Sequence, residues 1–193
     1  MARDYQNTPS QTNDLIAGLI RNTDFAVANA LGYGGMNFSP YVTDAATALV
    51  SQRLLGTLIP VRNGDIISKL HFSVSVAAAT VTTIKVGLYS AAATPARLAV
   101  SANTTTAMDN IGITGIALTT PYTVTANGFL YAVLLSDATT AGTVGTATGY
   151  TGKATSSTVG WPQSMAITQT GQTDLPATIT PTLATTPMWW SWL

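Results

Sequence analysis

Residues 69–76 alternate strictly between polar and large apolar side chains. The polar positions are Lys69, His71, Ser73 and Ser75, and the apolar positions are Leu70, Phe72, Val74 and Val76. Successive side chains of a β-strand point to opposite faces of the sheet, so this spacing predicts a strand with one face toward a core. We therefore expect an antiparallel sheet, with His71 on its polar, solvent-facing side.

Further strand signals flank this segment at short intervals. Runs rich in β-branched, aromatic or aliphatic residues occur at 54–61, 83–89, 97–101, 111–118, 122–125 and 129–135. The dipeptides Asn63-Gly64 and Asn127-Gly128 are typical of tight hairpin turns. Short strands separated by frequent turn signals indicate a sandwich. The sequence thus predicts a mainly β fold, an antiparallel, jelly-roll-like β-sandwich.

The last third of the chain gives a weaker pattern. Residues 138–187 are mostly Thr, Ala, Gly, Ser and Pro, with slight alternation at 143–148 and 177–180. Disordered segments usually carry more charge than this one. We expect long loops and short strands that lie on a surface, and the arrangement of this region stays open.

The first 35 residues differ from the rest. A polar stretch at 1–12 predicts an extended arm, and a short helix follows, which the glycines at 32–35 end. The helix carries one apolar stripe, formed by Leu15, Ile16, Leu19 and Ile20. Because so short a helix is marginal alone, the stripe predicts an anchoring or oligomerisation surface. We expect an arm and helix at 1–35 and the sandwich at 36–193.

Charge is scarce and limits the possible functions. Charged residues make up 8% of the 193 residues, the net charge is zero, and all eight acidic residues are aspartate. Nucleic-acid binding is disfavoured because basic residues are few and scattered. No apolar run is long enough for a membrane helix, so no membrane insertion is expected. The N-terminal residues do not resemble a signal peptide, which predicts synthesis in a cytoplasm without export.

Candidate catalytic and metal-binding residues receive little support. His71 is the only histidine and lies in the alternating segment, outside any nucleophile motif. The aspartates share no motif that would pair two carboxylates, and several fit turns or helix caps. We therefore expect no enzymatic activity, no cofactor and no metal site. Asn37 and Asn103 begin glycosylation sequons, a pattern that often arises by chance.

Three of the four tryptophans, Trp189, Trp190 and Trp192, lie close to Leu193. Exposed indoles at a chain end would form an aggregation-prone patch. Strand alternation places Trp189 on the face opposite to Trp190 and Trp192. We interpret the segment as a closing strand or a subunit contact. A sugar-binding platform is the alternative.

Four central segments carry a resemblance to a known family. They are Gly-Thr-Leu-Ile-Pro-Val at 56–61, Val-Gly-Leu-Tyr-Ser at 86–90, Ala-Leu-Thr-Thr-Pro-Tyr-Thr-Val at 117–124 and Asn-Gly-Phe-Leu-Tyr-Ala-Val-Leu-Leu at 127–135. Their order resembles β-sandwich modules in virion proteins of tailed phages, particularly those that infect actinobacteria. The resemblance spans roughly 80 residues and the Trp-rich ending, but not the first 40. Its motifs are structural and imply no active site.

The resemblance implies a structural protein of a phage particle. The expected roles are capsid decoration, head fibre or minor tail protein, displayed on the virion surface, and the choice between capsid and tail stays open. The expected partners are copies of this chain, as a trimer, and other virion proteins. The alternative is a carbohydrate-binding adhesin that contacts glycans of the host envelope.

Overall fold

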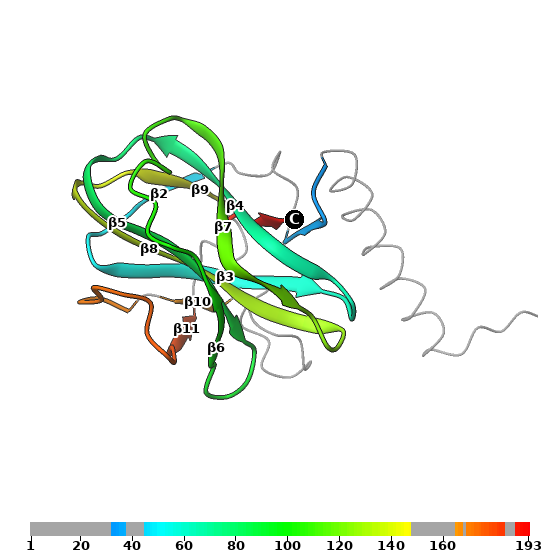
Figure 1. Cartoon of the computed structure of the whole chain (residues 1–193). Coiled ribbons are helices and arrows are strands. Elements are labelled where there is room, and N and C mark those ends of the chain that lie inside the picture. Colours follow the sequence, from blue (N-terminus) through cyan, green and yellow to red (C-terminus); the bar gives the residue numbers. More distant parts are fainter. Residues whose placement is uncertain (1–31, 38–44, 148–164, 168, 184–187) are drawn as a thin grey trace, which may run out of the picture.

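Two antiparallel sheets, A and B, form the described part of the molecule. The computed structural model describes residues 32–37, 45–147, 165–167, 169–183 and 188–193. Every regular element within these ranges is a β-strand. Each sheet has six strands (Figure 1). This confirms the predicted mainly β, antiparallel sandwich. The predicted arm and helix lie outside the described residues.

Sheet A is built around its longest strand, β4. The order is β1 (Gly35–Met36), β12 (Ser191–Trp192), β4 (Ile66–Val76), β9 (Thr143–Thr146) and β2 (Ala45–Ala48). The sixth strand, β7 (Gly112–Thr123), pairs with the other edge of β4. In Figure 1, β1 in blue and β12 in red lie side by side at one end of this sheet.

Sheet B follows the order β11 (Pro181–Leu183), β10 (Met165–Ile167), β3 (Arg53–Val61), β8 (Gly128–Thr140), β5 (Ala79–Ser90) and β6 (Arg97–Val100). The long strands β3, β8 and β5 form its centre. An isolated bridge between Ser101 and Leu118 joins the end of β6 to β7 of sheet A. The two sheets are therefore connected at this side as well as packed face to face.

Alternate residues of both sheets meet in one core. Sheet A contributes Ile67, Leu70, Phe72, Val74, Ile116, Leu118 and Val144, and sheet B contributes Leu55, Ile59, Val61, Ile84, Val86, Leu88, Leu130 and Leu134. The apolar face predicted from residues 69–76 is thus the core face. The prediction is wrong for Val76, which is 52% exposed. It is the last residue of β4, beyond the area that the opposite sheet covers.

β7 is longer than the sequence suggested. The runs at 111–118 and 122–125 were expected as two strands, but one strand passes through both. The two runs are separated by an irregularity in which β7 residues 118–121 lie between the pairs Ile67–Tyr122 and Lys69–Ala117, while β4 has a single residue there. Pro121 is one of these β7 residues without a partner on β4, so its missing N–H costs no ladder bond to β4.

β8 is buried on both faces, which explains its continuous apolar sequence. Its core face carries Leu130, Ala132 and Leu134, and its other face carries Tyr131, Val133 and Leu135. Leu175 and Ile179 cover the second face. They belong to residues 174–179, which we call the strap, and which cross the outside of sheet B. The slight alternation at 177–180 forms no strand, and Thr178 makes an isolated bridge with Ala96.

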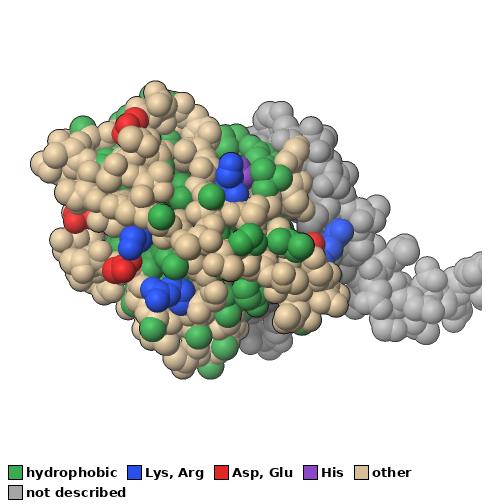
Figure 2. Space-filling view, in the orientation of Figure 1, with side chains coloured by type: hydrophobic (Ala, Val, Ile, Leu, Met, Phe, Trp, Pro, Cys, Tyr) green, Lys and Arg blue, Asp and Glu red, His purple; other side chains and the backbone are tan. Residues whose placement is uncertain are grey.

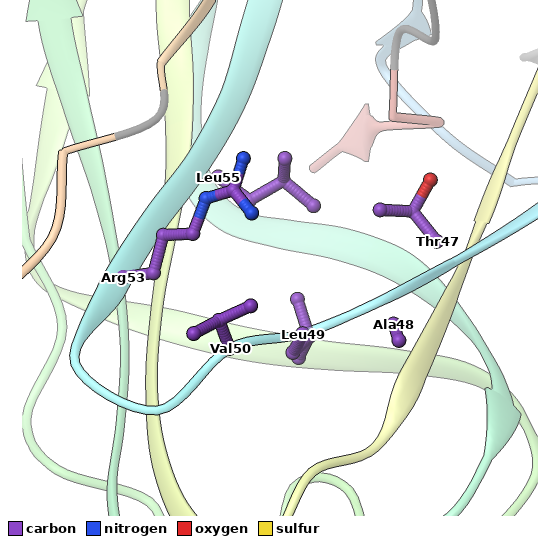
Figure 3. Close-up of a pocket in the computed structure, with 6 residues that line it drawn as sticks. All are labelled: Thr47, Ala48, Leu49, Val50, Arg53 and Leu55. Carbon is purple, nitrogen blue, oxygen red and sulfur yellow. The ribbon is translucent and has the colours of Figure 1, made fainter.

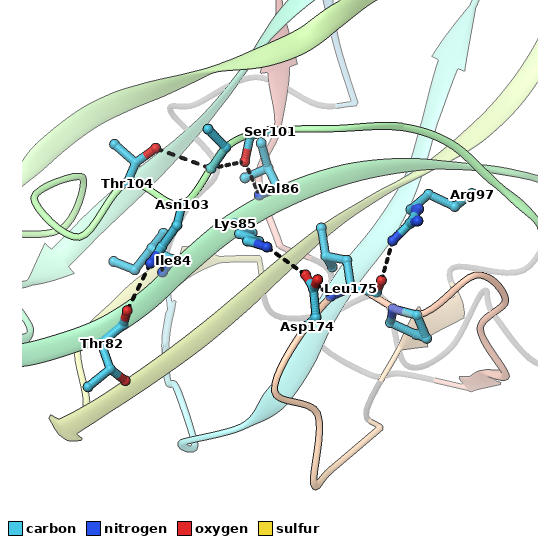
Figure 4. A network of polar contacts seen from close by, with 12 residues as sticks. Thr82, Ile84, Lys85, Val86, Arg97, Ser101, Asn103, Thr104, Asp174 and Leu175 are labelled. Atoms are coloured by element: carbon cyan, nitrogen blue, oxygen red, sulfur yellow. Dashed lines mark hydrogen bonds and ion pairs between the residues drawn. The ribbon is translucent and has the colours of Figure 1, made fainter.

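Side chains fasten the strap to sheet B (Figure 4). Lys85 Nζ lies 2.8 Å from Asp174 Oδ1, and Arg97 donates to the Leu175 carbonyl. The Tyr89 hydroxyl donates to the Pro176 carbonyl at 2.8 Å. Short segments without ladder partners need such bonds to satisfy their backbone groups. The few charged residues in this region thus hold the strap in place.

We expect Phe72→Ala to lower the free energy of unfolding by about 3–5 kcal/mol, because Phe72 is fully buried and packs against Trp190. Urea denaturation would measure the change. The matched control is Ser73→Ala, the next residue on the opposite face, with an expected change within about 0.5 kcal/mol. Equal effects at the two positions would contradict the assignment of the core face.

Candidate functional site

Strand β12 is inserted between β1 and β4. Trp192 is paired with Gly35 on one side and with Leu70 on the other. The Gly34 N–H donates to the Trp192 carbonyl at 2.7 Å, and the Leu193 N–H donates to the Lys69 carbonyl at 3.1 Å. We call residues 33–37 and 188–193 together the seam. It joins segments more than 150 residues apart in the sequence.

The three indoles predicted as structural lie within the seam. Trp190 and Trp192 belong to the core, and Trp190 packs against Phe72 with ring centroids 5.8 Å apart. Trp189 lies on the other face of sheet A, against Ala147 and Tyr33. At most 1% of each of the three residues is exposed. None of them offers an open ring face on which a sugar could stack.

Gly35 makes room for Trp192. A Cβ atom on Gly35 would lie 2.1 Å from Cζ2 of the Trp192 ring, which is far inside contact distance. A side chain at this position would therefore displace the indole from the core. The sheet begins at Gly35, one residue before the predicted domain boundary.

Asn37 continues the seam after β1 ends. Its Nδ2 donates to the Met188 carbonyl at 2.7 Å, and its Oδ1 accepts from the Trp190 N–H at 2.9 Å. Asn103 is used in a similar way, because Oδ1 accepts from the Ile84 N–H and Nδ2 donates to the Thr82 carbonyl. Both sequons therefore hold structural asparagines.

His71 is buried, which corrects the prediction that it faces solvent. It points away from the core, as its parity requires, but only 9% of the residue is exposed. The Tyr33 ring covers it with a centroid distance of 5.1 Å. On the β7 side the imidazole lies where a side chain of Gly115 would be, since a Cβ there would be 2.3 Å from Cδ2. The alternating pattern showed on which face of the sheet His71 lies, but not that Tyr33 covers it.

The surroundings of His71 disfavour its charged form. Burial, with the Lys69 ammonium as a smaller cause, lowers the pKa of His71 from 6.5 to about 4, although a backbone hydrogen bond at Ser191 acts in the opposite direction. This shift corresponds to roughly 3 kcal/mol. A tyrosine ring near an imidazolium contributes about 0.5–1 kcal/mol at exposed sites, so the desolvation cost is larger.

This pKa sets the pH range in which stability depends on His71. Between pH 6.5 and about 4 the unfolded chain binds a proton at this position and the folded chain does not. Stability from this group is therefore complete above pH 6.5 and is lost as the pH falls toward 4. Asp137 and Asp174 have pKa values below 3.8, so their stabilising contribution is lost only at lower pH.

Three described carboxylates, those of Asp65, Asp137 and Asp174, accept hydrogen bonds that fasten the chain to itself. Asp137 accepts a hydrogen bond from the Ser51 hydroxyl, which lowers its pKa. Asp174 accepts from Lys85 and from the Leu175 N–H, and the bond from Lys85 is the main cause of its lowered pKa. Asp65 accepts from the Arg62 N–H in the turn before β4. Each of these groups closes a turn or holds a neighbouring segment.

Two hollows in the described residues differ in size and in openness to solvent. The first, between β2 and β3, has a volume of about 10 Å³, which is room for one water molecule (Figure 3). Arg53 lies along its side with a buried Nε that has no hydrogen-bond partner in the described residues. The second is an open groove of about 410 Å³ on the outside of sheet B. It is lined by Leu58, Ala91, Ala92, Ala93, Tyr131, Thr180 and Pro181.

The visible surface carries few charges. Figure 2 shows a small number of basic and acidic side chains, some of them next to one another, among broad areas of uncharged side chains and backbone. Within the described ranges, no three His or Asp residues lie close enough together to hold a metal ion. In the same ranges, no helix is long and apolar enough to cross a membrane.

Comparison with known proteins gave no assignment. No family model matches the chain, and no curated protein matches it. The predicted stripe residues Leu15, Ile16, Leu19 and Ile20 lie outside the described residues. The structure therefore brings together the three tryptophans but does not test the stripe.

Sequence reasoning missed the cover of His71 and the role of Asn37. Tyr33 was seen only as part of a glycine-rich helix end, and Asn37 only as a sequon. The position of Tyr33 between glycines does indicate close packing against another segment, because glycines allow a bulky neighbouring chain to approach closely. The partner of that run could not be read from the sequence.

We expect a chain that ends at Pro187 to lose its cooperative thermal transition. Removing residues 188–193 takes away three buried indoles, each worth about 3–5 kcal/mol in a core, and the strand between β1 and β4. Calorimetry would measure the transition. Leu193→Ala is the control, because that side chain is 43% exposed and its backbone bonds remain. An unchanged transition in the shortened chain would contradict a structural role.

Proposed function

We propose that this protein is a non-enzymatic structural component of a phage virion. The proposed role is a capsid decoration, a head fibre or a minor tail protein on the particle surface. The segments that resemble phage virion modules lie in strands β3, β5, β7 and β8. Gly56 supports this reading of them as structural motifs, because a Cβ there would lie 2.5 Å from the Ala132 carbonyl oxygen.

The observation that carries the proposal is the use of charged groups for fastening. Lys85 and Asp174 bind each other and hold the strap, and Arg97 donates to the strap backbone. Asp65 and Asp137 accept bonds from nearby turn residues. A catalytic pair of carboxylates would instead face a shared cleft. This arrangement favours a rigid scaffold over an active site.

A surface with few charges suits packing against other subunits, since interface cores are depleted in charge. Large apolar side chains are exposed on sheet A, among them Ile66, Ile111 and Ile113, each more than half exposed. Together with the apolar stripe at residues 15–20, they favour a homo-oligomer. We propose a trimer, because closed symmetry buries such surfaces on every copy.

The location on the particle is the direct test. A peptide tag inserted at the exposed turn Asn63-Gly64, which has open space around it, would be labelled with antibody on purified particles and imaged by electron microscopy. We expect labels at regular positions on the capsid or along the tail. Untagged particles are the control. Purified particles that lack the protein would contradict the proposal.

Sedimentation equilibrium of the full chain tests the oligomer. We expect a mass of three chains at micromolar concentration, and a smaller species after Leu15→Ser and Leu19→Ser together, because these changes remove half of the stripe. A folded monomer in both proteins would contradict the trimer while leaving the virion role open to the labelling test.

The groove beside Tyr131 is the observation that favours the alternative, a glycan-binding module. Its volume of about 410 Å³ is sufficient for a small ligand. Glycans of the host envelope, titrated at millimolar concentration and followed by NMR, would distinguish the two functions. Binding that is lost in Thr180→Val or Leu58→Ala would support the adhesin. No binding is expected if the role is structural.

A further inference from the structure

Three side chains meet beside the seam, on the face of sheet A that points away from the core. His71 and Ser191 are directly paired on β4 and β12. Ser191 is small, so the Tyr33 ring reaches the His71 imidazole across β12. His71 is 9% exposed and Ser191 is 0% exposed. His71 Nδ1 and Ser191 Oγ are buried without a hydrogen-bond partner in the described residues.

The described groups around this imidazole compensate a positive charge only in part, through the backbone hydrogen bond at Ser191. On its own strand the charged neighbour is Lys69, which repels a proton on His71. β7 contributes Gly115, β12 contributes Ser191, and the segment before β1 contributes the Tyr33 phenol. None of the described groups that face the ring is a carboxylate. A protonated His71 therefore gains most by reaching water.

The segment with Tyr33 is a short edge segment of sheet A, and its opening also exposes Met36, which is 2% exposed in the closed form. β1 has two residues and pairs with β12 alone, whereas β4 and β8 each pair with strands on both sides. The Gly34 and Asn37 amides donate to carbonyls of Trp192 and Trp190. Short edge segments with few bonds open first in native proteins.

We propose that His71 is a proton-operated latch that holds residues 33–37 against sheet A. Neutral His71 keeps Tyr33 packed over the imidazole and β1 paired with β12. Protonation releases Tyr33 and β1, while the sandwich stays folded. The latch does not depend on the proposed function.

The expected size of the effect follows from the two protonation states. An open, solvated His71 has the ordinary pKa of 6.5, and the closed form has a pKa of about 4. The opening equilibrium of residues 33–37 should thus increase by up to about tenfold for each pH unit below 6.5, reach about 150-fold at pH 4, and level off at about 300-fold at lower pH.

Amide hydrogen exchange of the full chain between pH 7 and 4 tests the latch. Rates are converted to protection factors, which removes the pH dependence of the exchange chemistry itself. We expect protection of the Gly34 and Asn37 amides to fall by the factors above, while amides in β5 and β8 keep theirs. In His71→Gln, which stays neutral, protection of Gly34 and Asn37 should not change with pH.

Three results would overturn the latch. They are pH-independent protection of Gly34 and Asn37 in the natural chain, loss of protection in β1 and β8 together, and an unchanged pH dependence in His71→Gln. If His71→Gln does not fold, NMR titration of the imidazole in Tyr33→Ala decides. Removing the ring should raise the pKa of His71 toward 6.5, and an unchanged pKa would overturn the proposal.

Discussion

The insertion of β12 between β1 and β4 is the contact on which the rest of sheet A depends. It brings residues 188–193 beside residues 33–37, and both beside the centre of β4. Two of its tryptophans complete the core opposite sheet B, and the third covers the outer face. Contacts this distant in sequence form only after a large loss of chain entropy. The dense apolar surface of three indoles offsets that loss, and Gly35 provides the space for one of them.

Sheet B also has an apolar face that must be covered, and polar contacts hold its cover in place. β8 is apolar on both faces, so the face that points away from the core also needs a cover. The strap supplies Leu175 and Ile179 for that purpose. Because the strap has little ladder pairing of its own, side chains from β5 and β6 bond to its backbone carbonyls. Three charged residues, Lys85, Arg97 and Asp174, thus hold the strap where regular pairing ends.

The sequence predicted the core of the sandwich well, because that core depends on alternation within single strands. Leu70, Phe72 and Val74 face it as expected. The exposure of His71 was predicted wrongly, because alternation shows which face a side chain occupies and not what lies above that face. The residue that covers His71 is Tyr33, which lies 38 positions earlier in the sequence. Its ring reaches the imidazole across β12. For the same reason the strap was expected only as a surface segment, and its partner, the outer face of β8, was not identified. The virion role is an expectation from resemblance and stays a proposal.

The composition of the chain also determines how selectively it can respond to acid. The chain contains one histidine and no glutamate, so its carboxylic side chains are all aspartates, with an ordinary pKa near 3.8. Bonds from Ser51 and Lys85 move two of these aspartate pKa values still lower. A glutamate, with an ordinary pKa of about 4.3, would titrate further into the range above pH 4 than an aspartate does. His71 is the one side chain of this sequence whose ordinary pKa lies at the upper end of that range, so the proposed response to mild acid would fall where Tyr33 packs over the imidazole.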